Sequence, residues 1–257
     1  MKVSIVQTDI AWENSDKNLE ELSEKLKFLK QETDLIVLPE MFTTGFSMNP
    51  EKLAENPNGI TQQWMKNISK ELHTAVLGSL IIKEKGNYYN RLICQLPDSK
   101  YYTYDKRHLF RMGEENDHYT AGKEKVIFKY KGWRIRPLIC YDLRFPVWSR
   151  NRNDYDMLVY VANWPESRNH VWKNLLIARA LENQVYVVGV NRIGTDGQQL
   201  SYSGDSMIID PKGNLLSETV PYKQFIDTKE LSLESLNAFR KKFPVANDAD
   251  DFELKIY

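Results

Sequence analysis

The stretch WRIRPLICYDLRFP, residues 133–146, indicates both a core strand of the fold and the place of its chemistry. Its apolar run ends in Cys140, one of two cysteines in the chain, and charged residues and a proline follow at once. This order is typical of a strand that ends in a sharp turn with the thiol at its tip. Two other strand-like runs also end in ionisable residues: LIVLPE ends in Glu40, and YYTYDK ends in Lys106. A carboxylate, an ammonium and a thiol at three strand ends are the components of a nucleophilic active site.

The composition is that of an ordinary soluble globular protein. Of 257 residues, 27% are charged and 42% hydrophobic, and Lys+Arg and Asp+Glu both number 35. The zero net charge gives no indication of nucleic acid or an anionic membrane as partner, and no apolar run is long enough to cross a bilayer. Two cysteines cannot form a disulfide scaffold, and the N-terminus is strand-like rather than a signal peptide. We therefore expect a reduced, cytoplasmic protein.

Strand and helix patterns alternate along the whole chain, without a linker that would divide it. We expect strands at 3–7, 34–38, 74–83, 88–96, 100–105, 126–130, 133–140, 156–162 and 185–191, and a late hairpin of 206–210 with 215–218. We expect helices at 15–31 (with Ser15 as N-cap), 61–72, 145–152, 171–184 and 231–242. This alternation predicts a single α/β domain, a mixed β-sheet core with helices on its outer faces.

A catalytic cysteine needs a nearby base or positive charge, because its thiolate is the nucleophile. The chain has four histidines, and none lies in the local signature of a Cys–His–Asn protease. Glu40 and Lys106 are better partners: a partly buried carboxylate can act as general base and then acid, and a fixed ammonium can stabilise an oxyanion. Taken singly, Cys140 could be an inert core thiol, Glu40 a first-turn helix carboxylate and Lys106 a solvated strand end.

The joint pattern of these residues resembles the nitrilase superfamily, the carbon–nitrogen hydrolases. The matching motifs are LPEMF at 38–42, YDKRHLF at 104–110, ICYDLRFP at 139–146, VANWP at 161–165 and NRIG at 191–194. The resemblance implies a Glu–Lys–Cys triad of Glu40, Lys106 and Cys140. It also implies a four-layer α-β-β-α sandwich over residues 1–257 that pairs into homodimers, with the C-terminal tail, about 240–257, at the dimer contacts.

Many members of this superfamily have a second glutamate shortly after the lysine motif. Here the loop at 112–122 offers Glu114 and Glu115, and the spacing back from Gly122 favours Glu115. By the family's pattern this carboxylate positions the lysine and the substrate. Glu115 could instead be an exposed loop charge.

The motifs KRHLFRM at 106–112 and CYDLRFP at 140–146 are similar to those of the omega-amidase branch. These enzymes hydrolyse the terminal amide of 2-oxo-dicarboxylic acid monoamides such as 2-oxoglutaramate, whose far carboxylate needs an anchor. An arginine suits this role because it can grip a carboxylate with two parallel bonds. The expected substrate contacts are Arg144, Tyr141, Trp164, Asn163 and Tyr119. Their structural alternatives are an Arg144–Asp142 ion pair, packing for Trp164 and Tyr119, and a chain turn at Asn163.

Three functions follow from this interpretation. The first is an omega-amidase-like amidohydrolase that acts on a small-molecule amide through a cysteine thioester. The second is a related hydrolase that acts on a nitrile, an N-carbamoyl compound or another linear amide. The third is a non-catalytic binding protein on the same fold, which an intact triad disfavours. The scheme requires no metal or organic cofactor, and the sequence contains no metal-ligand cluster or glycine-rich phosphate loop.

Overall fold

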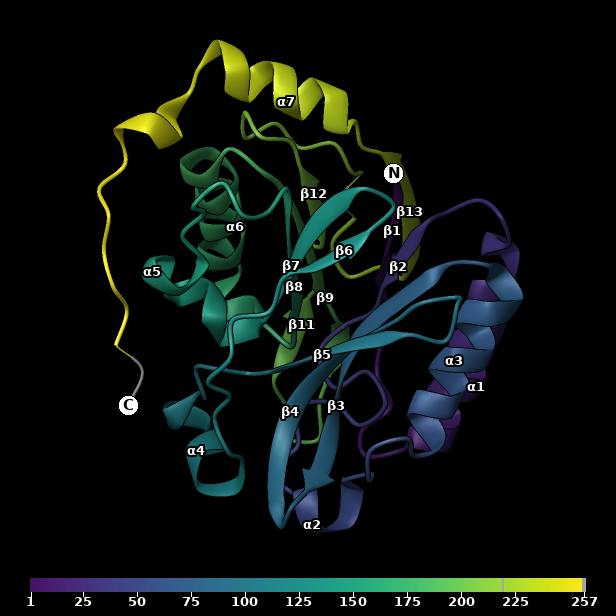
Figure 1. The fold of residues 1–257 in the computed structure, drawn as a ribbon. Coiled ribbons are helices and arrows are strands. Elements are labelled where there is room, and N and C mark those ends of the chain that lie inside the picture. Colours follow the sequence, from purple (N-terminus) through teal and green to yellow (C-terminus); the bar gives the residue numbers. More distant parts are fainter. Residues whose placement is uncertain (219, 256–257) are drawn as a thin grey trace.

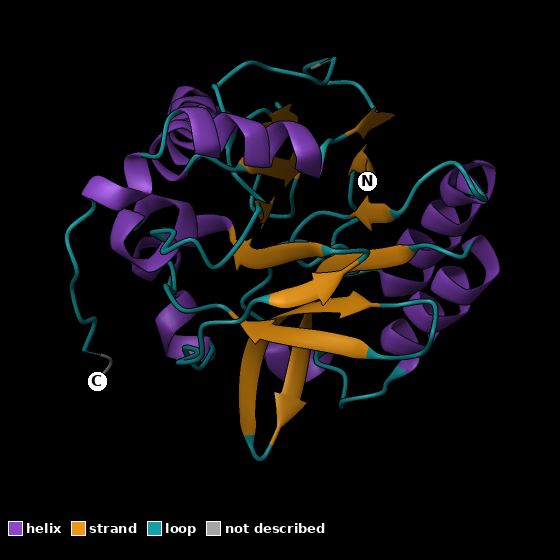
Figure 2. Ribbon diagram, turned by 45° about the horizontal axis from the view of Figure 1, so that its top comes forward, coloured by secondary structure: helices purple, strands orange, loops and turns teal. Residues whose placement is uncertain are grey.

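The computed structural model describes residues 1–218 and 220–255 of the chain. Two β-sheets pack face to face in this part of the protein, and helices cover both outer faces (Figures 1 and 2). The layers are therefore helix, sheet, sheet and helix, as the sequence predicts.

The first sheet has six strands in the order β13-β1-β2-β3-β4-β5. These strands are β1 (Lys2–Gln7), β2 (Leu35–Val37), β3 (Ala75–Glu84), β4 (Asn87–Gln95), β5 (Tyr101–Asp105) and β13 (Phe225–Glu230). The strands β1, β2 and β3 run parallel, whereas β3, β4 and β5 form an antiparallel meander. The all-apolar β2 serves both faces of the sheet: Leu35 and Val37 point to the second sheet, and Ile36 points to the helices.

The second sheet has five strands in the order β12-β9-β8-β7-β6. They are β6 (Phe128–Tyr130), β7 (Trp133–Ile139), β8 (Met157–Ala162), β9 (Tyr186–Asn191) and β12 (Met207–Ile209). Because β7, β8 and β9 are parallel neighbours, their carboxyl ends meet at one edge of the sheet. A separate hairpin of β10 (Ile193–Thr195) and β11 (Ser201–Ser203) follows β9.

The core lies between the sheets and under the helices. Leu19, Leu22 and Leu26 of helix α1 (Ser15–Leu26), together with helix α3 (Ile60–Leu72), pack on the first sheet, and α6 (Asn169–Asn183) packs on the second. The shorter α-helices are α2 (Pro50–Leu53), α4 (Glu115–His118), α5 (Pro146–Ser149) and α7 (Leu233–Lys242). The 3₁₀ helices are η1 (Lys27–Leu29), η2 (Arg111–Gly113), η3 (Cys140–Arg144), η4 (Glu166–Arg168) and η5 (Val245–Asp248). None of the helices in these two described ranges is both long and apolar enough to cross a membrane.

The structure corrects the predicted ends of two helices. The side chain that caps α1 is Asn14, which accepts a hydrogen bond from the Lys17 N–H, and not Ser15, which is already helical. The α-helix also stops at Leu26, where η1 continues it to Leu29. The helix expected at 145–152 is only the four-residue α5. Beyond it, the backbone N–H of Asn151 donates a hydrogen bond to the Asn183 side chain instead of continuing the helix.

Several strand assignments also differ from the sequence-based expectation, and the short strands β10 and β11 were not expected at all. The returning strand expected at 215–218 is reduced to a single bridge between Ile209 and Leu215. Strand β13 was not expected, because its sequence FIDTKE is polar; it pairs with β1 at the edge of the first sheet, where its residues stay partly exposed. Residues 256–257 of the C-terminal tail lie outside the described residues, and the dimer contact of this tail stays a prediction.

Candidate active site

Cys140 lies at the turn between β7 and the 3₁₀ helix η3. Its backbone has a φ of +43°, a left-handed conformation that residues other than glycine rarely adopt. The turn ends the strand abruptly, and the partly buried cysteine lines a cavity. Strained backbone of this kind persists only where the surroundings hold it. The sharp turn expected from the sequence is therefore present at the thiol.

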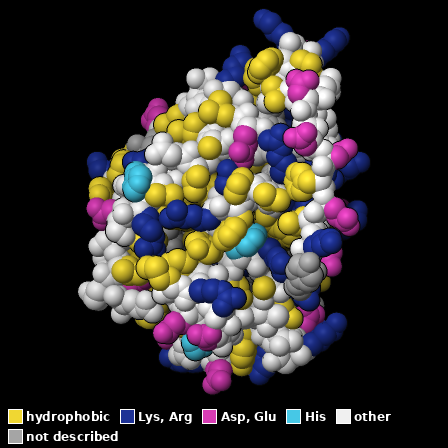
Figure 3. Space-filling model, turned by 90° about the vertical axis from the view of Figure 1, so that its left-hand side faces the viewer, with side chains coloured by type: hydrophobic (Ala, Val, Ile, Leu, Met, Phe, Trp, Pro, Cys, Tyr) yellow, Lys and Arg dark blue, Asp and Glu magenta, His cyan; other side chains and the backbone are white. Residues whose placement is uncertain are grey.

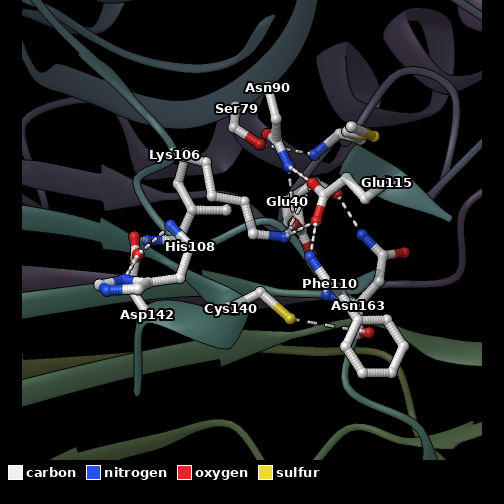
Figure 4. A network of polar contacts seen from close by, with 12 residues as sticks. Glu40, Ser79, Asn90, Lys106, His108, Phe110, Glu115, Cys140, Asp142 and Asn163 are labelled. Carbon is white, nitrogen blue, oxygen red and sulfur yellow. Dashed lines mark hydrogen bonds and ion pairs between the residues drawn. The ribbon is translucent and has the colours of Figure 1, made fainter. Parts of the chain in front are cut away.

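Glu40 and Lys106 approach from the other sheet. Glu40 follows β2 after a short connection, and Lys106 directly follows β5. Both side chains are fully buried, and Lys106 Nζ donates a hydrogen bond of 3.0 Å to Glu40 Oε1. The two groups form a buried ion pair beside the cysteine (Figure 4).

Glu115, the first residue of α4, is a second carboxylate that contacts Lys106. Lys106 Nζ lies 2.9 Å from both of its oxygens, and the backbone N–H of Phe110 donates to Oε2 at 2.6 Å. The neighbouring Glu114 is exposed and has a left-handed φ of +57°, which turns the chain so that Glu115 points inward. Of the two glutamates in the loop, the structure thus brings Glu115 to the lysine.

Asn90 of β4 joins the two carboxylates and was missed by the sequence analysis. It is fully buried, and its Nδ2 donates to Glu40 Oε1 at 2.8 Å and to Glu115 Oε1 at 3.2 Å. Locally, Asn90 is one of several polar residues in β4, together with Asn87, Arg91 and Gln95. The local sequence therefore does not distinguish a site residue from an ordinary polar position in a half-buried strand.

Asn163 ties the glutamate to the second sheet. It follows β8, and its backbone N–H donates to Glu40 Oε2 at 2.7 Å, while its side-chain Nδ2 donates to the Glu40 carbonyl at 2.6 Å. The Cys140 Sγ lies 4.0 Å from the Asn163 carbonyl oxygen. The next residue, Trp164, is held through its backbone by the side chain of Asn191 at the end of β9. Asn163 therefore fixes the position of Glu40 in addition to turning the chain.

The electrostatics of the site favour a neutral thiol beside the Lys106 ammonium. Burial disfavours the Lys106 ammonium, but the Glu115 and Glu40 carboxylates outweigh burial and raise the pKa of Lys106. Burial raises the pKa of Glu115, and Lys106 partly offsets this. The pKa of the Cys140 thiol is raised well above its usual range, first by burial and then by Glu40, with Lys106 acting in the opposite direction. The thiol consequently needs a base to become a nucleophile.

A cavity of about 370 Å³ opens over the thiol and the lysine. It is lined by Phe46, Met48, Lys106, Phe110, Met112, Gly113, Cys140, Tyr141, Arg144, Asn163, Trp164, Pro165, Arg168, Gln198, Leu200 and Tyr202. Four of the five expected substrate contacts are among these residues. The fifth, Tyr119, is outside this lining; it is buried behind it, and its hydroxyl donates to the Ser47 carbonyl at 2.6 Å. Tyr119 therefore packs and orders the wall instead of facing a ligand.

The cavity carries uncompensated positive charge. Its lining contains no aspartate or glutamate, and the charge of Lys106 is balanced by Glu40 and Glu115. Arg144 lies over the ring of Trp164 and Arg168 over the ring of Phe110, each at 5.4 Å from the ring centre. Within residues 1–218 and 220–255, neither guanidinium has an ion-pair or hydrogen-bond partner. The alternative Arg144–Asp142 ion pair is also absent from these residues. The cavity therefore suits an anion.

The basic character extends to the surface. On the face that carries α4, α5 and the C-terminal segment, basic and hydrophobic side chains gather side by side (Figure 3).

No cluster of three or more His, Cys, Asp or Glu that could hold a metal ion occurs in the part of the chain that the structure describes.

Some of the other cavity residues that the sequence analysis missed come from the β10–β11 hairpin. Tyr202 of β11 and Leu200 line the cavity, and the Tyr202 hydroxyl donates to Asp196 Oδ2 at 2.7 Å. Arg168, at the end of η4, was also missed. Only tertiary packing brings these segments to the strand ends, so no local pattern could have indicated them.

The chain is similar in sequence and in fold to known proteins. The family model for carbon-nitrogen hydrolases matches residues 2–241. The omega-amidase YafV of Escherichia coli K12 is 42% identical over 99% of this chain and 98% of its own length. The 2-oxoglutaramate amidase of Bacillus subtilis 168 is 33% identical over 96% of both chains. Among solved structures, a CN-hydrolase superfamily protein from Xanthomonas campestris with an arsenic adduct in its active site superposes with a TM-score of 0.96, at 40% identity and 99% coverage of both chains.

Proposed function

This chain belongs to the carbon–nitrogen hydrolase family, in its omega-amidase-like branch, and we propose that it hydrolyses the terminal amide of a small 2-oxo-dicarboxylic acid monoamide. A hydrolase of linear amides is what the family and its relatives establish. The finer proposal names 2-oxoglutaramate or 2-oxosuccinamate as substrate, with the corresponding dicarboxylic acid and ammonia as products.

One observation carries the choice of substrate: the cavity that holds the thiol also holds two arginines without acidic partners. A substrate with its reactive amide at one end and a carboxylate at the other could place the amide at the thiol and the carboxylate at an arginine. The guanidinium of Arg144 or Arg168 would bind the carboxylate with charge-assisted hydrogen bonds. Tyr141 and Trp164 would form the walls along the carbon chain.

The reaction we propose begins at the thiol. Glu40 takes the proton from Cys140 Sγ, and the sulfur forms a bond to the amide carbon. The electron pair of the carbonyl moves to its oxygen, and the Lys106 ammonium, with a backbone N–H near Cys140 such as that of Tyr141, stabilises this oxyanion. The raised pKa of the thiol supports a base-assisted attack, because little thiolate would form without one.

Collapse of the tetrahedral intermediate breaks the carbon–nitrogen bond. Glu40 returns its proton to the leaving nitrogen, which departs as ammonia, and a thioester remains on Cys140. Glu40 then takes a proton from water, whose oxygen attacks the thioester carbon. The acid is released, and the sulfur recovers a proton. Glu115 and Asn90 would keep Glu40 and Lys106 in place during both halves of the reaction.

The decisive experiment compares amides and related compounds on the purified protein by measuring ammonia release. We expect kcat/KM to be highest for 2-oxoglutaramate. Glutamine is the matched control, since it keeps the amide and the carboxylate but places an ammonium where the cavity is already cationic. A nitrile and an N-carbamoyl amine represent the other branches of the family. Faster turnover of either would contradict the proposed substrate and leave the family unchanged.

A further inference from the structure

Asp142 is a fully buried carboxylate two residues after the nucleophile, and it lies outside the cavity lining. It accepts four hydrogen bonds. One comes from the backbone N–H of Ile139, the residue before Cys140, at 3.0 Å. The others come from the Tyr104 hydroxyl at 2.7 Å, the His108 backbone N–H at 3.0 Å and the His108 Nδ1 at 2.7 Å. One side chain thus contacts the turn of the cysteine and the segment of the lysine.

Two of the residues that donate to Asp142 lie at equal distances along the chain on either side of Lys106. Tyr104 precedes Lys106 by two residues and His108 follows it by two, so both ends of the lysine segment are held by the same carboxylate. Figure 4 shows His108 and Asp142 on one side of the lysine, with Glu40 and Glu115 on the other. Because β5 and β7 belong to different sheets, these hydrogen bonds connect the two halves of the sandwich next to the thiol.

Aromatic packing makes this contact rigid. The His108 ring stacks on Phe145 with ring centres 3.7 Å apart, and its edge meets Trp148. The Tyr104 hydroxyl also accepts the Trp148 Nε1–H at 3.0 Å. Burial and the Asp142 carboxylate raise the pKa of Tyr104, so that its hydroxyl keeps the proton it donates.

Cys140 needs such a restraint because its left-handed backbone, φ +43°, is strained. The Asp142–Ile139 hydrogen bond closes the turn that contains this backbone. Without it, the turn would relax toward an ordinary conformation and carry the sulfur away from Glu40 and Lys106. We propose that Asp142 is a positioning residue that sets the Cys140 thiol against Glu40 and Lys106 by bonding the turn of the cysteine to the flanks of the lysine.

The kinetic part of the test rests on the proposed amidase function, and a chemical part is independent of it. For Asp142→Asn, whose amide group would face N–H donors, we expect kcat to fall about a hundredfold while KM changes less than about twofold. We also expect alkylation of Cys140 by iodoacetamide near neutral pH to slow by about tenfold, because the displaced thiol loses its base. Mass spectrometry would locate the adduct on Cys140 rather than on the buried Cys94.

Asp156→Asn is the matched control. Asp156 is also a buried carboxylate with several donors, but it precedes β8 at the opposite end of the parallel strands from Cys140. Its loss should lower the unfolding midpoint without changing kcat or the alkylation rate of the folded protein. Equal kcat and alkylation rates in Asp142→Asn and Asp156→Asn would overturn the proposal, since Asp142 would then be a structural group only.

Tyr104→Phe decides the question if Asp142→Asn does not fold. This variant removes one hydrogen bond to Asp142 and keeps the ring, so we expect a milder fall in kcat, about tenfold, with KM unchanged. Wild-type kcat and alkylation rate in folded Tyr104→Phe would contradict a positioning role. If the protein released no ammonia from 2-oxoglutaramate but alkylation still responded to both substitutions, the positioning role would stand and the proposed substrate would fail.

Discussion

Lys106 Nζ lies 3.0 Å from Glu40 Oε1, with both side chains fully removed from solvent. The same ammonium lies 2.9 Å from Glu115, so a single ammonium holds two carboxyl groups in the interior. A buried charge without its partner is expensive, whereas a surface pair contributes little. Lys106, which we propose as a catalytic residue, is therefore also a structural residue.

Replacing Lys106 with Met should destabilise the fold as well as abolish ammonia release. The substitution leaves Glu40 and Glu115 without a cation, and removing one partner of a buried pair costs about 3–5 kcal/mol. Denaturant unfolding followed by far-UV circular dichroism would measure the loss. Lys131→Met, at the half-exposed pair with Asp34, is the control and should cost less than about 1 kcal/mol. Equal losses for the two variants would contradict the structural role of Lys106.

Replacing Cys140 with Ala should abolish ammonia release without unfolding the protein. The change removes the sulfur from a cavity wall, where Cys140 is only partly buried at the edge of the core. Mass spectrometry of wild type mixed with substrate should show a thioester adduct that the variant lacks. Cys94→Ala is the control: this fully buried thiol, whose pKa burial raises, lies in the core between the sheets. That variant should keep its activity and lose about 1 kcal/mol of stability. Retained activity in Cys140→Ala would disprove the mechanism.

Replacing Arg144 or Arg168 with Gln should weaken binding of the substrate's carboxylate. A hydrogen bond to a charged group contributes about 1.5–3 kcal/mol, so KM for 2-oxoglutaramate should rise about 10- to 150-fold at the residue that binds the carboxylate. KM for a neutral amide should not change. Arg111→Gln, an exposed arginine outside the cavity lining, provides the control. Unchanged KM in both cavity variants would exclude the arginines as the anchor.

The stability contributed by Asp156 should disappear in acid. Burial opposes its ionisation, but hydrogen bonds from Arg134 and Arg240 outweigh burial and lower the pKa of Asp156 below its usual 3.8. A carboxylate with a lowered pKa in the folded state stabilises above the unfolded pKa, and this stability is lost as pH falls through the folded value. The free energy of unfolding of the wild type should therefore exceed that of Asp156→Asn by about 2 kcal/mol at pH 7. The difference should persist to about pH 4 and shrink below it. Urea unfolding at several pH values would measure it, and a difference that grows in acid would contradict the assignment.

Sequence reasoning works well for the reactive groups because each follows a recognisable strand: β2 and β7 are mostly apolar and buried, and β5 is rich in tyrosine. Such strands can be recognised from their composition, and Glu40, Lys106 and Cys140 lie at or just after their ends. The parallel order of β7, β8 and β9 then brings Cys140 and Asn163 to the same edge. Spacing alone separated Glu115 from Glu114.

Sequence reasoning fails where a contact depends on segments meeting from distant parts of the chain. Arg168, Tyr202 and Asn90 reach the site through the packing of η4, β11 and β4, and their immediate neighbours carry no pattern for it. The edge strand β13 was missed for a related reason. An edge strand that stays partly exposed has no need of an apolar sequence, so its pairing with β1 leaves no mark in the composition.

The division of the proposed catalytic groups between the sheets has a consequence for folding. Glu40 and Lys106 belong to one sheet, and Cys140 and Asn163 belong to the other, so neither half of the sandwich contains a competent site. During refolding, each sheet could form its own hydrogen bonds before the two dock. Circular dichroism should then recover ahead of ammonia release, and the appearance of activity would report the moment at which the two sheets close on each other.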